Sequence, residues 1–365
     1  MRGAEFGRAV RAGAGAMTGG QGFGGNRPTA AIFGCEGTRL SPTEAAFFRD
    51  ADPLGFILFA RTVEDPDQLR RLTADLRAAV GRDAMVLVDQ EGGRVQRLRA
   101  PHWREWLPPL DQVARSRPGQ MERGVWLRYR LIADELRAVG IDANCAPTAD
   151  IAGPETHPFL RNRCFGHDAA TVSAAARACA DGLLAGGVLP VMKHVPGHGR
   201  TVVDSHHDLP TATAPAEELI RTDFAPFRAL NDLPIGMTAH IVVPAYDGDN
   251  PSTGSQKMIT VIRMEIGFGG LLLTDDLTMQ ALSGTLADRT ARAIAAGCDI
   301  ALHCNGVRAE MEAVAKAAGP MTDPAVVRAG AALSRRQTPG PIDAAALLAE
   351  LDGLILPAEP DRAHG

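Results

Sequence analysis

Short apolar runs alternate along the chain with longer segments in which apolar residues return every three or four positions. Eight runs are continuously apolar, which is typical of strands buried on both faces of a parallel sheet. In chain order they are AAIFGCEG (30–37), GFILFA (55–60), AMVLVDQEGG (84–93), IDANCAPTAD (141–150), VLPVMKHVPG (188–197), PIGMTAH (234–240), LLLTDDL (271–277) and DIALHC (299–304). The hydrophobic pattern therefore predicts eight strands.

The segments between these runs carry helix signals. In one of them, Asp65 is placed as an N-cap, Pro66 stands at the first helical position, and Gln68 can close a capping box. Three leucines follow at helical spacing before Gly81, a residue that commonly ends helices. Apolar residues also lie on one helical face over 125–139. Strands thus alternate with helices.

Eight alternating units predict a single (β/α)₈ barrel of the TIM type, possibly irregular. A doubly wound open sheet is the alternative, because strand number is difficult to fix from one sequence. We assign one catalytic domain to residues 28–356, because no internal linker interrupts the pattern. Residues 1–27 are expected to be a disordered extension or a leftover of cloning, and 357–365 a tail.

Polar residues gather where the predicted strands end. In a barrel of this type the chemistry lies at the carboxyl ends of the strands. The residues at these ends are Glu36, Asp89, Gln90, Glu91, Asp150, Lys193, His194, His240, Asp275 and Asp276. Their placement predicts an active site at this end of the barrel.

The stretch MKHVPGHGRTVVDSHHDLP (192–210) contains four histidines, at 194, 198, 206 and 207. Glycine and proline separate them, so no helix presents two of them on one face, and we expect no metal ion. No G-x-G-x-x-G motif of dinucleotide-binding folds opens a helix after a predicted strand, no P-loop is present, and no cofactor is expected. Asp204 lies two residues before His206. A carboxylate beside an imidazole raises the pKa of the imidazole, so the protonated histidine is available as a general acid near neutral pH.

Composition narrows the class of protein further. The formal net charge of −5 and the dispersed basic residues argue against nucleic acid as a partner. No run of about 18 apolar residues is present, so no membrane span is expected. The six cysteines form no C-x-x-C pair, which favours a reduced, cytoplasmic protein. We expect a monomer or a weak dimer.

Four motifs in fixed order carry a specific resemblance: LVDQEGGRVQRL, RNRCFG, the 192–210 stretch and LLLTDDLTM. Together they resemble the bacterial β-N-acetylglucosaminidases of glycoside hydrolase family 3, cytoplasmic enzymes of peptidoglycan recycling. The likeness extends from about residue 30 to about residue 304. It implies a retaining exo-hydrolase that acts on an amino-sugar substrate, a terminal β-linked N-acetylglucosamine of peptidoglycan fragments.

The resemblance also implies roles for individual residues. Asp275 would be the nucleophile, His206 the acid/base and Asp204 its partner. The sugar would be bound by the residues that match the family's binding positions, namely Asp89, Arg97, Arg163, Lys193 and His194. Two positions depart from the family pattern: Val195 stands where phenylalanine is usual, and Arg200 where an acid is usual.

Several residues have less specific interpretations. His198 and His207 are expected to pack within their loop, and Asp276 to be structural. Trp103 and Trp106 would form either a sugar platform or a solvent-facing apolar patch. The functional alternatives are a family 3 glycosidase of another specificity, an inactive sugar-binding protein, and a phosphorylase, in which Arg200 would help to bind phosphate.

Overall fold

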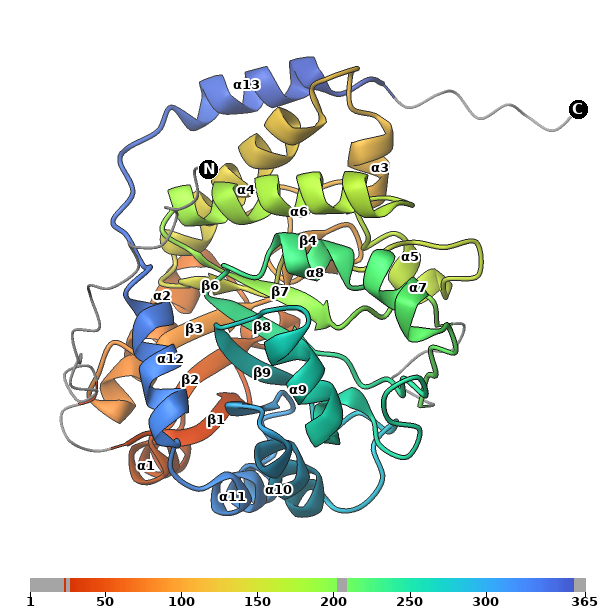
Figure 1. Cartoon of the computed structure of the whole chain (residues 1–365). Coiled ribbons are helices and arrows are strands. Elements are labelled where there is room, and N and C mark those ends of the chain that lie inside the picture. The colour runs from red at the N-terminus through yellow and green to blue at the C-terminus, as the bar shows by residue number, and fades with distance from the viewer. Residues whose placement is uncertain (1–22, 24–26, 202–208, 358–365) are drawn as a thin grey trace, which may run out of the picture.

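The computed structural model describes residues 23, 27–201 and 209–357. Eight parallel strands close into a barrel in the order β1-β10-β9-β8-β7-β6-β3-β2, with helices around it (Figure 1). The strands are β1 (Thr29–Gly34), β2 (Pro53–Leu58), β3 (Met85–Val88), β6 (Ala143–Asn144), β7 (Leu189–Val195), β8 (Ile235–Thr238), β9 (Leu271–Asp276) and β10 (Ile300–His303). The predicted (β/α)₈ barrel is confirmed, and the open sheet is excluded.

The barrel closes between the first and last strands. Ala31 of β1 pairs with Ala301 of β10, and Phe33 pairs with Phe56 of β2 on its other side. All eight strands coincide with predicted runs, and nearly every residue in them is buried. The continuous apolar pattern arises because one face of each strand fills the barrel and the other contacts helices.

Helices cover the outside of the barrel (Figure 1). They are α1 (Pro42–Ala51), α2 (Pro66–Val80), α3 (Pro109–Ala114), α4 (Met121–Arg137), α5 (Pro158–Arg161), α6 (Ala169–Ala185), α7 (Ala216–Arg221), α8 (Ala225–Ala229), α9 (Gln256–Met264), α10 (Leu286–Ala296), α11 (Arg308–Ala318), α12 (Asp323–Leu333) and α13 (Ala344–Leu354). Helix α13 crosses over α4 at the outer edge (Figure 1).

The predicted start of α2 is confirmed with one change. Asp65 accepts a hydrogen bond from the Gln68 amide, and Gly81 ends the helix in the left-handed region. The Gln68 side chain accepts from the amide of Glu64 rather than from that of Asp65, so the capping box is displaced by one residue. The second predicted helix, 125–139, is α4, which begins four residues earlier, at Met121.

A two-stranded hairpin follows β3, and the sequence pattern did not predict it. Its strands are β4 (Gln90–Gly92) and β5 (Val95–Gln96). Gly92 has a φ of 107°, and a Cβ at this position would overlap the guanidinium of Arg128. Gln90 fixes the far strand, because its side-chain oxygen accepts from the amide of Arg97 at 2.9 Å. The hairpin thus returns Arg97 to the end of the barrel that Asp89 occupies.

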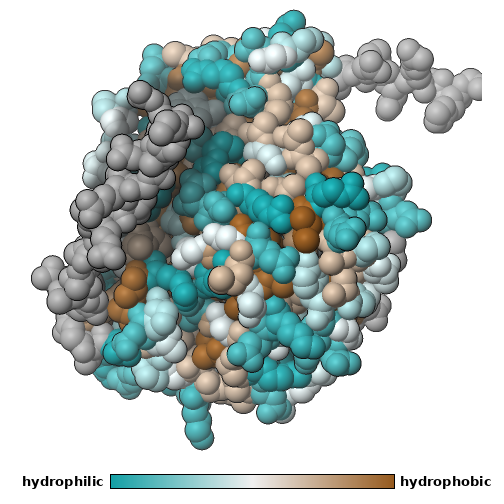
Figure 2. Space-filling model, in the orientation of Figure 1, coloured by the Kyte–Doolittle hydropathy of each residue, from teal (hydrophilic) through white to brown (hydrophobic). Residues whose placement is uncertain are grey.

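The outer surface is mixed in character. On the face shown in Figure 2, strongly hydrophobic residues occur as small separate spots among hydrophilic ones. The exposed large apolar residues of the described chain are Leu209, Met264, Val307, Val327 and Leu356. None of the described helices has the length and apolar character needed to cross a membrane. The predicted extension and tail lie almost wholly outside the described residues.

Candidate active site

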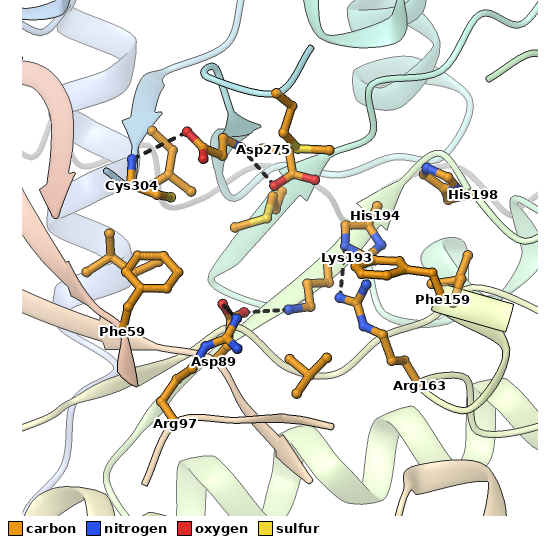
Figure 3. Close-up of a pocket in the computed structure, with 17 residues that line it drawn as sticks. Phe59, Asp89, Arg97, Phe159, Arg163, Lys193, His194, His198, Asp275 and Cys304 are labelled. Carbon is orange, nitrogen blue, oxygen red and sulfur yellow. Dashed lines mark hydrogen bonds and ion pairs between the residues drawn. The ribbon is translucent and has the colours of Figure 1, made fainter. Parts of the chain in front are cut away.

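A cavity opens at the carboxyl ends of the barrel strands, where the sequence predicted the active site (Figure 3). All five predicted sugar-binding residues and the predicted nucleophile line it. The lining consists of Ile57, Phe59, Asp89, Val95, Arg97, Phe159, Leu160, Arg163, Lys193, His194, His198, Met237, Asp275, Asp276, Met279, Leu302 and Cys304. Strands from all sides of the barrel therefore contribute to one site.

Asp89 follows β3 and faces two cations. Lys193 Nζ lies 2.8 Å from one carboxylate oxygen, and Arg97 Nη2 lies 3.0 Å from the other. Burial alone would raise the pKa of Asp89, but the charges of Lys193 and Arg97 outweigh it and hold this pKa below its usual range. Asp89 is therefore ionised, and its carboxylate oxygens can only accept hydrogen bonds.

Glu91 lies behind Asp89 and completes an ion-pair cluster. Arg163 donates to both of its carboxylate oxygens, at 3.0 and 2.9 Å, and Lys193 Nζ lies at 2.6 Å. The carboxyl is 1% exposed, yet the charges of Arg163 and Lys193 keep its pKa below the usual range despite burial. Glu91 is thus a fixed counter-charge, and its ionisation makes it unsuitable as a proton donor. We refer to Asp89, Glu91, Arg97, Arg163 and Lys193 as the charge cluster.

His194 lies near the end of β7, beside the charge cluster. Its Nδ1 lies 2.7 Å from Asp150 Oδ2, and its Nε2 lies 3.4 Å from Arg163 Nη2. Asp150 is fully buried, and the neighbouring His194 and His198 hold its pKa below the usual range although burial opposes ionisation. The sequence marked Asp150 as a strand-end carboxylate, but the structure places it behind His194 rather than on the cavity wall.

The two acids at the end of β9 have different surroundings. Asp275 accepts a hydrogen bond from the Asp276 amide at 2.8 Å, its one hydrogen bond within the described part of the chain. Burial raises its pKa, but His194, His240, this amide and Lys193 together lower it, so Asp275 is ionised. Asp276 accepts from the Thr278 hydroxyl and amide and from the Cys304 amide, which supports its structural interpretation.

His198 has a role that the sequence did not predict. It packs within its loop, as expected, because its Nδ1 lies 2.8 Å from Thr201 Oγ1. It also lines the cavity beside His194, with the two rings 5.9 Å apart. Burial lowers the pKa of His198 to about 4, so the ring is neutral near pH 7. The signal in the sequence was its position four residues after His194 on a glycine-rich turn.

Arg200, one of the two departures from the family pattern, is held away from the cavity. Its Nε lies 2.7 Å from Asp223, and its Nη2 contacts Glu218 at 2.7 Å and Thr222 at 3.0 Å. These contacts tie the segment after β7 to α7 and the residues that follow it. The charge of Arg200 is therefore balanced by Glu218 and Asp223, and these two acids accommodate an arginine at a position where the family usually has an acid.

Both interpretations of the tryptophans are wrong. Trp103 and Trp106 are 8% and 6% exposed and belong to the main hydrophobic core, so they form neither a sugar platform nor a solvent-facing patch. Phe59 and Phe159 supply the aromatic walls of the cavity instead. Glu36 also lies outside the cavity: its amide donates to Glu44, and its side chain is exposed.

Asp204, His206 and His207 lie outside the described residues, so their predicted roles stay predictions. Within 27–201 and 209–357, no group of three His, Cys, Asp or Glu side chains is placed to hold a metal ion. All six cysteines are free and buried. The described part of the site consists of the charge cluster, the carboxylate of Asp275 and the two histidines His194 and His198.

Residues 38–329 match the family model described as the glycosyl hydrolase family 3 N-terminal domain. The chain belongs to this family. A β-hexosaminidase from Methylococcus capsulatus is 36% identical over 327 residues, which cover 87% of this chain and 94% of the relative. One from Bordetella parapertussis is 35% identical over 277 residues, 74% of this chain and 78% of the relative. The chain is therefore a glycoside hydrolase.

Solved structures agree with this assignment. A structure of NagZ from Neisseria gonorrhoeae in complex with N-trifluoroacetyl-D-glucosamine superposes with a TM-score of 0.78 at 29% identity. The match covers 91% of this chain and 99% of that chain. A β-N-acetylhexosaminidase from Beutenbergia cavernae has a TM-score of 0.72 at 28% identity, covering 84% of this chain and 96% of that one.

Replacing Glu91 by Gln tests the charge cluster. The change leaves Arg163 and Lys193 short of a counter-charge, and breaking a buried pair in this way costs about 3–5 kcal/mol of unfolding free energy. The pKa of Glu91 is lower in the folded state than in the unfolded chain. The stabilisation that its ionised carboxylate gives is therefore complete above the unfolded pKa of about 4.3, and it is lost as the pH falls through the folded pKa. The free energy of unfolding, measured with urea, should therefore be much lower in Glu91→Gln than in the parent at pH 7, and this difference should narrow towards pH 3.

The control is Glu350→Gln, which removes an exposed partner of Arg123 on α13. An exposed pair contributes little, so this variant should unfold like the parent at every pH. A Glu91→Gln variant that behaves like the control would mean that the charge cluster does not stabilise the fold.

Proposed function

We propose that the chain is a retaining exo-β-N-acetylglucosaminidase that removes terminal N-acetylglucosamine from peptidoglycan fragments during cell-wall recycling in the cytoplasm. Its substrate would be GlcNAc-1,6-anhydro-MurNAc, with or without attached peptide. The observation that carries the proposal is an ionised Asp275 in the same cavity as the charge cluster, within a family 3 barrel. The β-hexosaminidase relatives and the glucosamine derivative bound by a structural neighbour support the sugar class.

The charge cluster would bind the hydroxyl groups of the terminal sugar. Asp89 can accept two hydrogen bonds, and Arg97, Arg163 and Lys193 supply donors around it. Because these side chains already hold one another, they need little reorganisation when the sugar enters. His194 would contact the same ring from the end of β7, so that the anomeric carbon faces Asp275.

Asp275 would act as the nucleophile. A retaining mechanism requires an ionised carboxylate that attacks the anomeric carbon, forms a glycosyl ester and releases the leaving group. The lowered pKa of Asp275 keeps the carboxylate ionised, and its single hydrogen bond among the described residues leaves it available. Asp276 accepts three hydrogen bonds and is less suited to this step.

The proton donor would be His206, with Asp204 as its partner, as the family motif implies. The described residues support this by elimination. The cavity carboxyls are Asp89, Asp275 and Asp276, and Glu91 and Asp150 behind them are ionised in buried contacts. Lowered pKa values make Asp89, Glu91, Asp150 and Asp275 unsuited to protonate a departing oxygen near pH 7, and Asp276 is held by three hydrogen bonds, so a donor from another segment is needed.

Water rather than phosphate would complete the reaction. The phosphorylase alternative depends on Arg200 as a phosphate ligand, but its guanidinium contacts Glu218 and Asp223 and does not line the cavity. After the glycosyl ester forms, neutral His206 would remove a proton from water, which attacks the anomeric carbon and releases the sugar and Asp275. The net reaction is hydrolysis with retained configuration.

The deciding experiment is an assay with 4-nitrophenyl N-acetyl-β-D-glucosaminide, with and without inorganic phosphate. We expect nitrophenol release at the same rate in both conditions and free N-acetylglucosamine as the sugar product. Sugar 1-phosphate in the phosphate arm would instead identify a phosphorylase. Preferred cleavage of the corresponding glucoside or xyloside would indicate another glycosidase, and no cleavage of any of the three would contradict the enzyme proposal.

Asp275→Ala should abolish turnover, because no covalent intermediate can form, while N-acetylglucosamine binding measured by calorimetry should persist. The matched change is Asp276→Asn, which keeps the side-chain shape beside Thr278 and should retain measurable turnover. An activated fluoro-sugar should label Asp275, as read by peptide mass spectrometry. A label on Asp276 would assign the nucleophile to the neighbouring residue.

His206→Ala should slow a substrate with a poor leaving group by about 10²–10⁴-fold, the usual contribution of general acid catalysis. With a nitrophenyl leaving group, formation of the glycosyl ester no longer needs a proton donor. Hydrolysis of that ester, which still needs a base, should then limit the rate. Azide should then restore turnover by attacking the ester without a base, giving a β-glycosyl azide. Equal slowing of both substrates without azide rescue would exclude His206 as the acid/base.

A further inference from the structure

We propose that Asp150 is a positioning residue that holds the two cavity-lining histidines, His194 and His198, in the orientation that binds the sugar. Neither the family assignment nor the predicted site gives Asp150 a role. The inference rests on the proposed function, because it assumes that the cavity binds an amino sugar. Asp150 itself does not line the cavity.

One carboxylate serves both histidines. Asp150 Oδ2 lies 2.7 Å from Nδ1 of His194 and accepts a second, longer contact from the His194 amide at 3.3 Å. Asp150 Oδ1 accepts from the His198 amide at 2.6 Å. The side chain of Asp150 is fully buried, so no water competes for these contacts.

Strand pairing explains why Asp150 reaches both residues. Beyond the end of β6, Thr148 still pairs in parallel with Lys193 of β7, and the Ala149 amide donates to the Lys193 carbonyl at 2.7 Å. This register brings Asp150 beside His194. The chain then turns back at Gly199, where an added Cβ would overlap the carbonyl of Ile151. The turn after β7 thus packs directly against the residue that follows Asp150.

The contacts with Asp150 also determine which ring nitrogen of His194 carries the proton. An ionised carboxylate only accepts, so Nδ1 of His194 carries the proton and its Nε2 is left as an acceptor when the ring is neutral. Arg163 Nη2 lies 3.4 Å from that Nε2, which is a long hydrogen bond. In His198, Nδ1 lies 2.8 Å from Thr201 Oγ1, while Nε2 is buried and has no hydrogen-bond partner among residues 27–201 and 209–357.

His194 lines the cavity, so its acceptor nitrogen Nε2 can take a hydrogen bond from a donor on the ligand. Sugar hydroxyl groups and the N–H of an acetamido group are such donors. Asp150 would therefore act through the histidines: it leaves His194 Nε2 as an acceptor for the sugar and anchors the backbone of His198, without touching the sugar itself. This differs from the charge cluster, which supplies mainly donors around Asp89.

The test replaces Asp150 by Asn and compares it with Asp142→Asn. Asp142 is an equally buried acid that immediately precedes β6, where it contacts Arg336 at 2.7 Å and the Val86 amide at 2.8 Å. Both changes remove one buried negative charge, so both should lower the melting temperature. Only Asp150→Asn should weaken N-acetylglucosamine binding, and it should lower kcat/KM by about 10–100-fold, the typical cost of losing an outer carboxylate that orients a binding histidine.

Nitrogen-15 NMR of the histidine rings gives a readout that a purely structural role would not change. The His194 signals, assigned by their loss in His194→Gln, should show a proton on Nδ1 in the parent protein and in Asp142→Asn. Asp150→Asn should shift the proton towards Nε2. Because the parent spectrum is informative alone, the inference stays testable even if Asp150→Asn fails to fold.

Two results would overturn the inference: a parent His194 ring protonated mainly on Nε2, or equal sugar affinity and kcat/KM in the two Asn variants. Failure of the proposed function is distinguishable, because then the parent protein itself would neither bind N-acetylglucosamine nor cleave its glycoside. The ring spectra would still show whether Asp150 sets the proton position of His194.

Discussion

The site depends on one buried arrangement of charges between β3 and β7. Lys193 lies between Asp89 and Glu91, Arg163 closes on Glu91 with two hydrogen bonds, and Arg97 closes on Asp89. Charges buried to this degree are tolerated only when they are paired and their remaining hydrogen-bonding atoms are satisfied. The cluster therefore fixes how the strand ends approach one another, and any ligand must fit an arrangement that already exists.

The barrel supplies the rigid frame for this cluster. Lys193 and His194 lie on β7, whose residues are all buried, and Asp275 ends β9. The hairpin β4–β5 is the less regular part, because it must return Arg97 to Asp89. Gly92 makes that return possible, since its φ of 107° and its closeness to Arg128 leave no space for a side chain. The site thus combines strand ends set by the barrel with one tight turn set by a glycine.

The positions of the barrel strands and the location of the site could be predicted from the sequence. Continuous apolar runs arise only where both faces of a strand are covered, so the strand positions and the cluster of polar strand ends followed directly. The predicted sugar-binding residues and Asp275 do line one cavity. The hairpin was missed because β5 has two residues, too few for any periodicity.

Side-chain environments were harder to predict than strand positions. Trp103 and Trp106 were interpreted as a sugar platform or a solvent-facing patch, but both indoles are buried in the main hydrophobic core. Glu91 and Asp150 looked equivalent to Asp89 as strand-end acids. Their difference depends on which cations and amides reach them: Arg163 binds Glu91, and the amide of His198 reaches Asp150. Such pairings come from the fold and not from spacing along the chain.

The same pairings restrict the chemistry of the site. The cluster contains three cations and two carboxylates and so carries a net positive charge. Burial raises the pKa of Asp275, but His194, His240, the Asp276 amide and Lys193 of the cluster together lower it. A positive environment that keeps carboxylates ionised also removes them as proton donors. In the proposed mechanism a neutral sugar would be attacked at Asp275, and its leaving oxygen would be protonated by a group held apart from the cluster. This separation of charge is the physical reason to expect the acid on a different segment from the nucleophile.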